Sequence, residues 1–290
     1  MKKSNIKLMS ALLTLTLSGS SFCLTSCTNG EKGNTEIEDF SLLGNTEKID
    51  EIFTKNNIRS IINELQTYGV SCEYTEKLNS LEVNSLEGYD FSELPDRFYT
   101  LFNDLLRYTS VDHLCCFSKD LAPNLDLSKL NLDGISHLGL FGNDDIINYV
   151  NSYVLNLNSL YILLDETSLA TNRLNLNVQG ITEVTVLSGN SNVIELGNVN
   201  FSGAKESELI LSGFVVTNQT SFNCNDVTVN LTGSVEDATP LTGLKNIVFE
   251  YRDNETGKKI SYIPNISDID EIVRKINSIK GVKSLKKENI

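Results

Sequence analysis

Apolar residues alternate with other residues in short runs along most of the chain, and each run is bounded by Gly, Asn, Asp or Ser. This two-residue period predicts strands with one buried face. Aligned on the first apolar strand residue, the runs begin at Leu81, Leu114, Leu138, Leu160, Val184, Leu209, Val227 and Ile247. The successive spacings are 33, 24, 22, 24, 25, 18 and 20 residues, which are typical of a solenoid. In such a fold each coil adds one strand to a parallel sheet and stacks its apolar residues on the neighbouring coils.

Three other segments have apolar residues at the spacing of an amphipathic helix. Residues 46–68 predict one helix that ends at Gly69, or two helices with a break near Asn56 and Asn57. Residues 94–108 predict a second helix, and Ser267 is expected to cap a third over residues 268–279. The first and third helices would cover the ends of the solenoid, which otherwise expose apolar surface and strand edges.

The runs resemble the leucine-rich repeat, L-x-x-L-x-L-x-x-N. Ile135, Leu138, Leu140 and Asn143 match this motif in full, and six other runs match its apolar part. The resemblance covers about residues 78–251 and implies an α/β repeat solenoid of the leucine-rich-repeat type, with a parallel sheet of short strands and capping helices at both ends. The closing asparagine stands in register only at Asn143. A looser parallel β-solenoid, with extra strands near residues 174–178 and 193–196, is therefore the alternative.

The N-terminus has the pattern of an export signal. Three lysines within the first seven residues precede an apolar run, residues 8–17, that is too short to span a bilayer. Leu24, Thr25, Ser26 and Cys27 resemble the lipobox of bacterial lipoproteins, which implies cleavage before Cys27 and acylation of its thiol. The expected organisation is a signal peptide (1–26), a flexible tether (27–44), an N-terminal helical cap (45–77), the solenoid (78–251), and a C-terminal turn, capping helix and basic tail (252–290).

The net charge restricts the partners. The chain carries a formal charge of -14, and removal of residues 1–26, which contain three lysines and no acidic residue, takes it to -17. An acidic surface repels phosphate groups, so we expect no nucleic-acid partner, and we expect contact with the membrane through the lipid on Cys27 alone. The protein would then lie on the extracytoplasmic face of the cell membrane.

Cysteine and histidine give weak signals for chemistry. The four cysteines that follow Cys27 form no C-x-x-C pair, and we interpret them as buried apolar residues rather than disulfides: Cys72, Cys115, Cys116 and Cys224. His113 and His137 stand before the first apolar residue of successive strands, where stacking brings their backbones within about 5 Å. With Asp112 or Asp133 they are a candidate metal site. Polar residues of several types occupy the same place in other runs, so we favour an ordinary half-exposed position and expect no metal and no cofactor.

Motifs for catalysis are missing from the sequence. It contains no G-x-S-x-G, H-E-x-x-H, P-loop or EF-hand pattern. The outward strand positions hold a single carboxylate, whereas glycoside hydrolysis needs two. We therefore expect no catalytic residues and no enzymatic activity.

The outward strand positions instead carry apolar side chains. In leucine-rich-repeat proteins this face of the sheet is the usual ligand surface, so the resemblance implies a binding stripe made of Phe117, Phe141, Tyr161, Leu163, Leu187 and Ile210. An exposed apolar stripe of this size indicates a partner. The alternative is that the protein covers this face itself, with its N-terminal segment or by tight packing of the coils.

These observations predict a lipid-anchored cell-surface protein that binds a protein or glycan partner without catalysis. A lipid-anchored, polysaccharide-active β-solenoid enzyme is the second hypothesis. A solute-binding lipoprotein is a third, which the solenoid spacing disfavours because such proteins need two α/β lobes.

Overall fold

The structure is a computed structural model. It describes residues 46–189, 194–203, 207–224, 227–235, 239–244, 246–252 and 259–262. The chain divides into two units, residues 1–52 and 53–290. Only residues 46–52 of the first unit are described, and they begin helix α2 (Thr46–Thr67). The predicted signal peptide, Cys27, the tether, the helix over residues 268–279 and the basic tail all lie outside the described residues.

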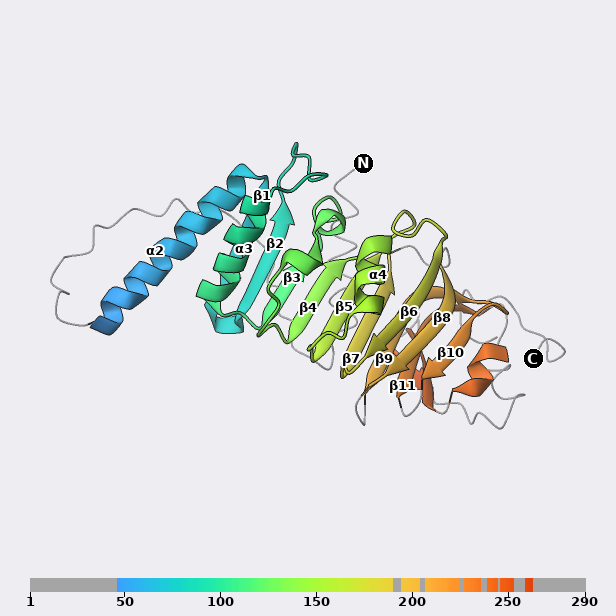
Figure 1. The fold of residues 1–290 in the computed structure, drawn as a ribbon. Coiled ribbons are helices and arrows are strands. Elements are labelled where there is room, and N and C mark those ends of the chain that lie inside the picture. Colours follow the sequence, from blue (N-terminus) through green and yellow to red (C-terminus); the bar gives the residue numbers. More distant parts are fainter. Residues whose placement is uncertain are drawn as a thin grey trace. The chain divides into compact units, whose positions relative to one another are not determined.

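The second unit is built on a long, mostly parallel sheet (Figure 1). Its main path runs β1-β2-β3-β4-β5-β7-β9-β11-β12-β13, parallel from β2 to β12 and antiparallel at each end. The first strands of this path are β1 (Val70–Thr75), β2 (Ser80–Ser85), β3 (His113–Cys116), β4 (His137–Phe141) and β5 (Ser159–Leu164). The remaining strands are β7 (Glu183–Ser188), β9 (Glu208–Val216), β11 (Thr228–Val235), β12 (Asn246–Arg252) and β13 (Lys259–Tyr262).

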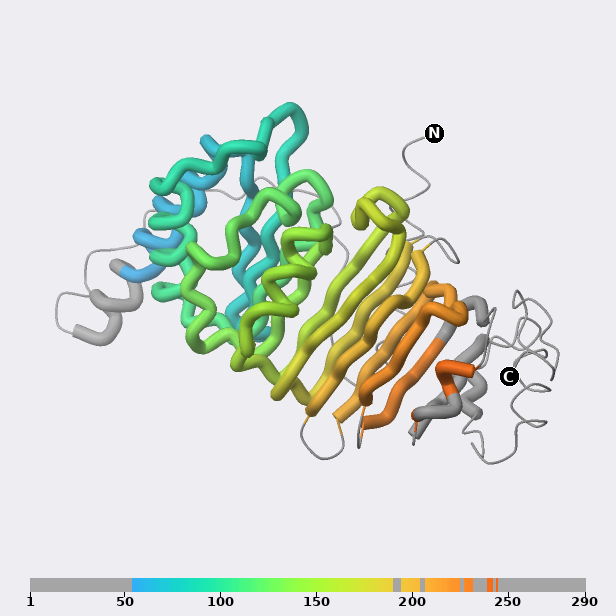
Figure 2. The backbone as a smooth tube through the Cα atoms, turned by 45° about the vertical axis from the view of Figure 1, so that its right-hand side comes forward, coloured from blue at the N-terminus to red at the C-terminus, as the bar shows by residue number. Residues whose placement is uncertain are grey.

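A second layer covers the inner face of this sheet, because each parallel strand from β2 to β11 is followed by an element that returns the chain (Figures 1 and 2). The early return elements are helical: α3 (Asp96–Thr109), the short 3-10 helices η2 (Ala122–Asn124) and η3 (Leu127–Lys129), and α4 (Asp144–Ser152). The later ones are the strands β6 (Arg173–Gln179), β8 (Glu195–Ser202) and β10 (Ser221–Cys224), then the 3-10 helix η4 (Thr239–Gly243). The early coils therefore pair strands with helices, and the later coils pair strands with strands.

Alternating burial explains why the two layers form. From Leu174 to Gln179 of β6 the residues alternate between buried Leu or Val and exposed Asn or Gln, so one face packs on the main sheet and the other faces solvent. The inward residues Leu114, Leu138, Leu160 and Val184 are each no more than 2% exposed. On the helical side, α3 fills the space above the first strands with aromatic rings, and Phe98 and Phe102 are fully buried. Burial of such side chains stabilises the fold by about 1.5–3 kcal/mol each.

The observed register confirms the predicted strand alignment up to β9. Leu81, Leu114, Leu138, Leu160, Val184 and Leu209 lie directly beside one another in consecutive strands. The predicted start of the next strand is wrong by two residues, because Leu209 pairs with Val229 and not with Val227. The last two spacings are therefore 20 and 18 residues, because Val229 pairs in turn with Ile247, and Asn230 occupies the outward place beside Ile210. Val227 itself is buried ahead of the strand, which is why the apolar pattern pointed to it.

The ends of the unit differ from the prediction. Helix α2 is continuous through Asn56 and Asn57, and the chain turns at Gly69, where φ is +80°. The predicted N-terminal cap, residues 45–77, is not purely helical, since it contains β1. The C-terminal segment was expected to begin at residue 252, but Arg252 still belongs to β12, and Lys259 begins the antiparallel strand β13, which was not predicted. No helix among the described residues is long and apolar enough to cross a lipid bilayer.

Strand β9 links the two layers. Residues up to Ser212 pair with β7, whereas Val215 pairs with Glu195 of β8. Gly213 lies between these two parts with φ of +85°, and a β-bulge displaces the pairing with β11 at the same level. A Cβ at this position would lie 2.8 Å from the carbonyl oxygen of Ser188. Glycine is needed here for both its backbone conformation and its lack of a side chain.

Candidate functional site

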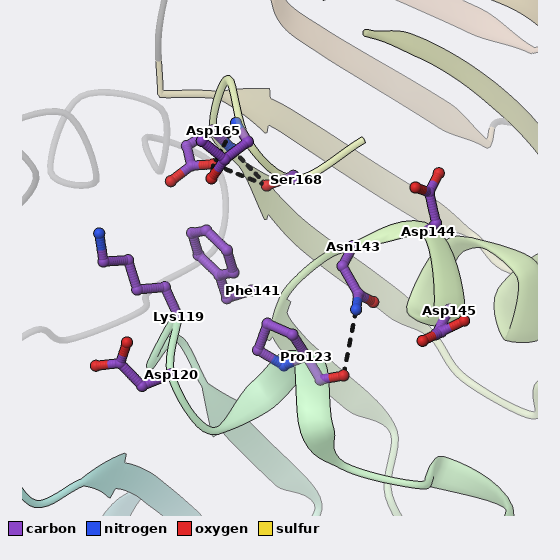
Figure 3. A pocket seen from close by; sticks show the side chains of 10 residues that line it. Lys119, Asp120, Pro123, Phe141, Asn143, Asp144, Asp145, Asp165 and Ser168 are labelled. Atoms are coloured by element: carbon purple, nitrogen blue, oxygen red, sulfur yellow. Dashed lines mark hydrogen bonds between the residues drawn. The ribbon is translucent and has the colours of Figure 1, made fainter. Parts of the chain in front are cut away.

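A pocket lies at the carboxyl ends of three consecutive strands, β3, β4 and β5 (Figure 3). Its volume is about 630 Å³. Because the strands are parallel, the loops that follow them meet at one edge of the sheet and supply the lining side chains. These are Lys119, Asp120, Pro123, Phe141, Asn143, Asp144, Asp145, Asp165, Thr167 and Ser168.

Asn143 holds two sides of the pocket together. Its Oδ1 accepts a hydrogen bond from the Ile146 N–H at 2.9 Å and so caps α4. Its Nδ2 donates to the carbonyl oxygen of Pro123 at 3.2 Å, which ties α4 to the loop after β3 (Figure 3). On the other side, the Asp144 carboxylate accepts from the Ala170 N–H at 2.9 Å. The three loops are thereby fixed to one another.

Asp165 lies in the loop after β5 and lines one side of the pocket. Its Oδ1 accepts hydrogen bonds from the Thr167 N–H at 2.9 Å, the Thr167 hydroxyl at 2.7 Å and the Ser168 hydroxyl at 3.2 Å. Partial burial acts to raise the pKa of this carboxyl, but these hydrogen bonds and the nearby Lys119 charge outweigh it and hold the pKa below its usual range. Asp165 is therefore ionised near neutral pH.

The lining carries more negative than positive charge. Four carboxylates, those of Asp120, Asp144, Asp145 and Asp165, line the pocket together with one ammonium group, that of Lys119. In Figure 3 the ring of Phe141 stands between Lys119 and Asp165. An acidic pocket favours a cationic group over an anion.

The structure brings the predicted binding stripe together, but half of it is buried. Phe141, Leu163 and Leu187 lie beside one another in consecutive strands and are 6%, 5% and 2% exposed. Phe117, Tyr161 and Ile210 are half-buried. The buried half does not offer a free surface, which agrees better with a self-covered face than with an open stripe. Phe141 also lines the pocket described above.

Phe117 and Tyr161 pack together on the outward face. Their rings meet edge to face with centroids 5.4 Å apart, and the Phe117 ring lies over Gly139, where a Cβ would come within 2.6 Å of it. Burial raises the pKa of the Tyr161 phenol. Its hydroxyl and the Asn230 Oδ1 are buried, and neither has a hydrogen-bond partner in the described part of the chain.

The two histidines also meet as predicted, although their rings stack. The ring centroids of His113 and His137 are 4.0 Å apart with an interplanar angle of 8°. A ring nitrogen binds metal through a lone pair in the ring plane, and parallel stacked rings direct these lone pairs side by side rather than toward one point. His113 Nδ1 is 2.6 Å from an Asp112 carboxylate oxygen, and His137 Nδ1 is 2.6 Å from the Ser159 hydroxyl. Within the described ranges, no group of three or more His, Cys, Asp or Glu side chains is placed to hold a metal ion.

The four cysteines of the described chain are free thiols. Burial raises the pKa of Cys72, Cys115 and Cys116 to about 12 and that of Cys224 to about 11. These thiols stay protonated at neutral pH, whereas a nucleophilic cysteine needs its thiolate.

Sequence reasoning missed the pocket, although the sequence held a signal for it. Lys119, Asn143 and Asp165 occupy the closing place of three consecutive repeats, where the leucine-rich repeat has asparagine. Three polar residues of different charge at one repeat position indicate that the side chains at this edge of the sheet line a pocket. The other lining residues come from loops without a common period.

Comparison with known proteins gives no relative. No protein-family model, no curated protein and no solved structure matches this chain. The function must therefore be argued from the geometry.

Proposed function

We propose that this protein is a lipid-anchored, non-catalytic binding protein on the extracytoplasmic face of a bacterial cell membrane. Its solenoid, of an irregular leucine-rich-repeat type, presents a repeat surface to a protein or glycan partner. The observation that carries the proposal is the acidic pocket at the carboxyl ends of β3, β4 and β5, which takes lysine or arginine side chains of a protein partner. Cys27, acylated after signal cleavage, supplies the anchor.

The strand alignment supports the leucine-rich-repeat type for the early coils. Five consecutive steps, from Leu81 to Leu209, keep the first apolar residue of each strand in register. Asn143, the one closing asparagine, bonds both to its own coil and to the preceding one. The later coils, with strands β6, β8 and β10 as return elements, fit the looser β-solenoid better. We infer a scaffold that changes from the first type to the second along its length.

The charges of the pocket support a basic ligand group. In Figure 3 Asp120 lies at one end of the pocket and Asp145 at the other, so different basic side chains of a partner would meet these two carboxylates, which accept no hydrogen bond among the described residues. Both carboxylates are exposed, and an ion pair between exposed groups adds about 0.2–1 kcal/mol, so the affinity grows with the number of such pairs. The acidic net charge of the chain would also speed the encounter with a basic partner.

A polysaccharide-active enzyme is the second candidate, because the pocket holds several carboxylates. Glycoside hydrolysis requires one carboxyl group that keeps its proton near neutral pH and a second that is ionised. Asp165 has a lowered pKa and so does not suit the acid role. Of the two roles, Asp165 could therefore fill only that of the ionised carboxylate.

The proposal is tested by measuring the affinity of the purified lipoprotein in detergent for tri-lysine and tri-arginine peptides. Replacing Asp120 and Asp145 together by Asn should weaken binding by about three- to tenfold. Asp133→Asn, an exposed carboxylate outside the pocket, serves as the control and should leave the affinity unchanged. Equal peptide affinity in the Asp120/Asp145 variant and the wild type would contradict the proposal. Release of sugars from a panel of polysaccharides, abolished by Asp144→Asn, would favour the enzyme instead.

A further inference from the structure

The outer face of the second layer carries a dense array of amide and hydroxyl side chains. Strands β6, β8 and β10 lie parallel to one another there and are visible at the front of Figure 1. Their outward residues, which we call the amide face, are Asn175, Asn177, Gln179, Asn198, Asn200, Ser202, Ser221 and Asn223. All are exposed except Asn200, which is half-exposed.

The amide face repeats in register from strand to strand. Asn177, Asn200 and Asn223 stand beside one another on the three strands, and Asn198 stands beside Ser221. Neighbouring strands are about 4.8 Å apart, so a chain that crosses them meets the same chemical group at each step. The pattern therefore suits a ligand that itself repeats.

Hydrogen bonds hold several of these side chains in fixed positions. Asn175 Oδ1 accepts from the Asn198 N–H at 2.9 Å and lies over Gly197, where a Cβ would come within 2.3 Å of it. Asn198 Oδ1 accepts from the Ser221 hydroxyl at 2.7 Å. Asn177 Nδ2 donates to the Asn151 carbonyl oxygen at 3.3 Å. The face is thus organised before a ligand arrives, which lowers the entropic cost of binding.

Several side chains of the amide face still have donor or acceptor groups that a ligand can bind. Within the described chain, the Nδ2 groups of Asn175 and Asn198 and the Oδ1 of Asn177 have no partner, and Asn200 has none for its whole side chain. An amide offers donors and an acceptor close together, and this suits a hydroxyl group, which both donates and accepts.

The amide face is also uncharged, in a chain that is strongly acidic. The charged residues of β6, β8 and β10 are Arg173 and Glu195, which pair with each other at 2.8 Å at one end of the sheet. An anionic polymer would find no cation to bind there. A protein partner would find none of the aromatic or aliphatic anchors that form the centre of protein interfaces.

We propose that the amide face binds an uncharged polysaccharide that crosses β6, β8 and β10 along the row of Asn177, Asn200 and Asn223. The charge-free surface and the matching of amides to hydroxyl groups select this occupant. The site lies outside the acidic pocket and does not depend on it. Each amide–hydroxyl contact adds little net affinity, so binding grows with the number of strands that the ligand spans. A long polysaccharide therefore binds more tightly than a disaccharide of the same sugar.

The test is affinity electrophoresis of the lipoprotein in neutral detergent, in native gels that contain dextran, mannan or a soluble β-glucan. Retardation by at least one of these polymers is expected, unchanged by added salt because no ions are released. The double variant Asn177→Asp, Asn200→Asp should weaken this binding by about tenfold or more. The control variant Asn56→Asp, Asn148→Asp adds the same charge at exposed helix positions and should be retarded like the wild type.

A second variant, Asn177→Ala with Asn200→Ala, adds no charge and should lose binding to the same degree with an unchanged circular dichroism spectrum. The proposal is overturned if none of the three polymers retards the protein, if only the anionic polymer dextran sulfate does, or if both double variants bind like the wild type. The pocket variant Asp120→Asn, Asp145→Asn should keep its retardation. The experiment therefore distinguishes a loss of binding at the amide face from a loss of binding at the pocket.

Discussion

At the scale of single residues, the stacked histidines are a pH-sensitive point of the sheet. The His137 ring stacks on the His113 ring, and its Nδ1 contacts the Ser159 hydroxyl. The Nδ1 of His113 contacts the Asp112 carboxylate. Burial lowers the pKa of His137 below its ordinary value of 6.5, the neighbouring His113 lowers it further, and Asp112 partly offsets both. The folded protein therefore favours the neutral ring more than the unfolded chain does.

The sign of the resulting pH dependence follows from this shift. A histidine whose pKa is lowered by folding adds its full stability above the unfolded pKa of about 6.5 and loses it as the pH falls below that value. We expect the melting temperature to drop between about pH 7.5 and about pH 5.5. In His137→Asn, which places an amide near the same hydrogen bond without a titrating group, the drop should be smaller. Thermal unfolding at a series of pH values measures it, and identical profiles for both proteins would refute the assignment.

Some features of the candidate site could be predicted from single residues and others could not. The proximity of His113 and His137 followed from the repeat spacing, because equivalent positions of adjacent coils are neighbours. The stacking of the rings did not, since ring orientation depends on Asp112 and Ser159. The burial of Leu163 and Leu187 was also beyond the sequence, because outward strand positions look alike whether or not something covers them. The pocket could not be predicted from the sequence, because its lining depends on how three loops fold against one another.

At the scale of elements, the strands of the main sheet were predictable because their inward residues repeat. The elements that were missed are short or lack this repeat. Strand β10 spans only Ser221–Cys224, and α4 follows β4 within the part of the repeat that the motif does not define. The antiparallel strands β1 and β13 lie beyond the two ends of the parallel region, where no neighbouring repeat indicates them. Periodicity therefore predicts the interior of a solenoid better than its ends.

Strand β9 gives a prediction at this scale, because Gly213 allows it to reach both layers. Gly213→Ala places a Cβ against the Ser188 carbonyl oxygen in a backbone conformation of positive φ. Together these effects should lower the free energy of unfolding by about 2 kcal/mol or more. Gly180→Ala is the matched control, since φ is +78° there and nothing lies within 4 Å of the added Cβ, so that it should cost only about 1 kcal/mol. Urea unfolding measures both, and equal costs would mean that the contact with Ser188 is relieved.

At the scale of the whole molecule, the described surfaces separate by charge. The pocket at the ends of β3, β4 and β5 is acidic, whereas the amide face of β6, β8 and β10 is neutral. The change of return elements from helices to strands accounts for this division, because helix α4 and the loops around it build the pocket and only the strands supply a flat face. One solenoid can thus present two surfaces to partners of different chemistry.

The anchor decides where these surfaces act, and Cys27 is the residue that tests it. Cys27→Ala removes the thiol that the lipobox-like segment would present for acylation, so we expect no incorporation of labelled fatty acid and either release into the medium or an unprocessed precursor. Because one methylene of an acyl chain adds about 0.8 kcal/mol of membrane affinity, loss of two or three chains should abolish membrane retention. Cys23→Ala, with Phe22 at a place where the motif needs a small residue, should be labelled and retained normally. Normal labelling of Cys27→Ala would refute the anchor, while the pocket and the amide face would then be tested on a secreted protein.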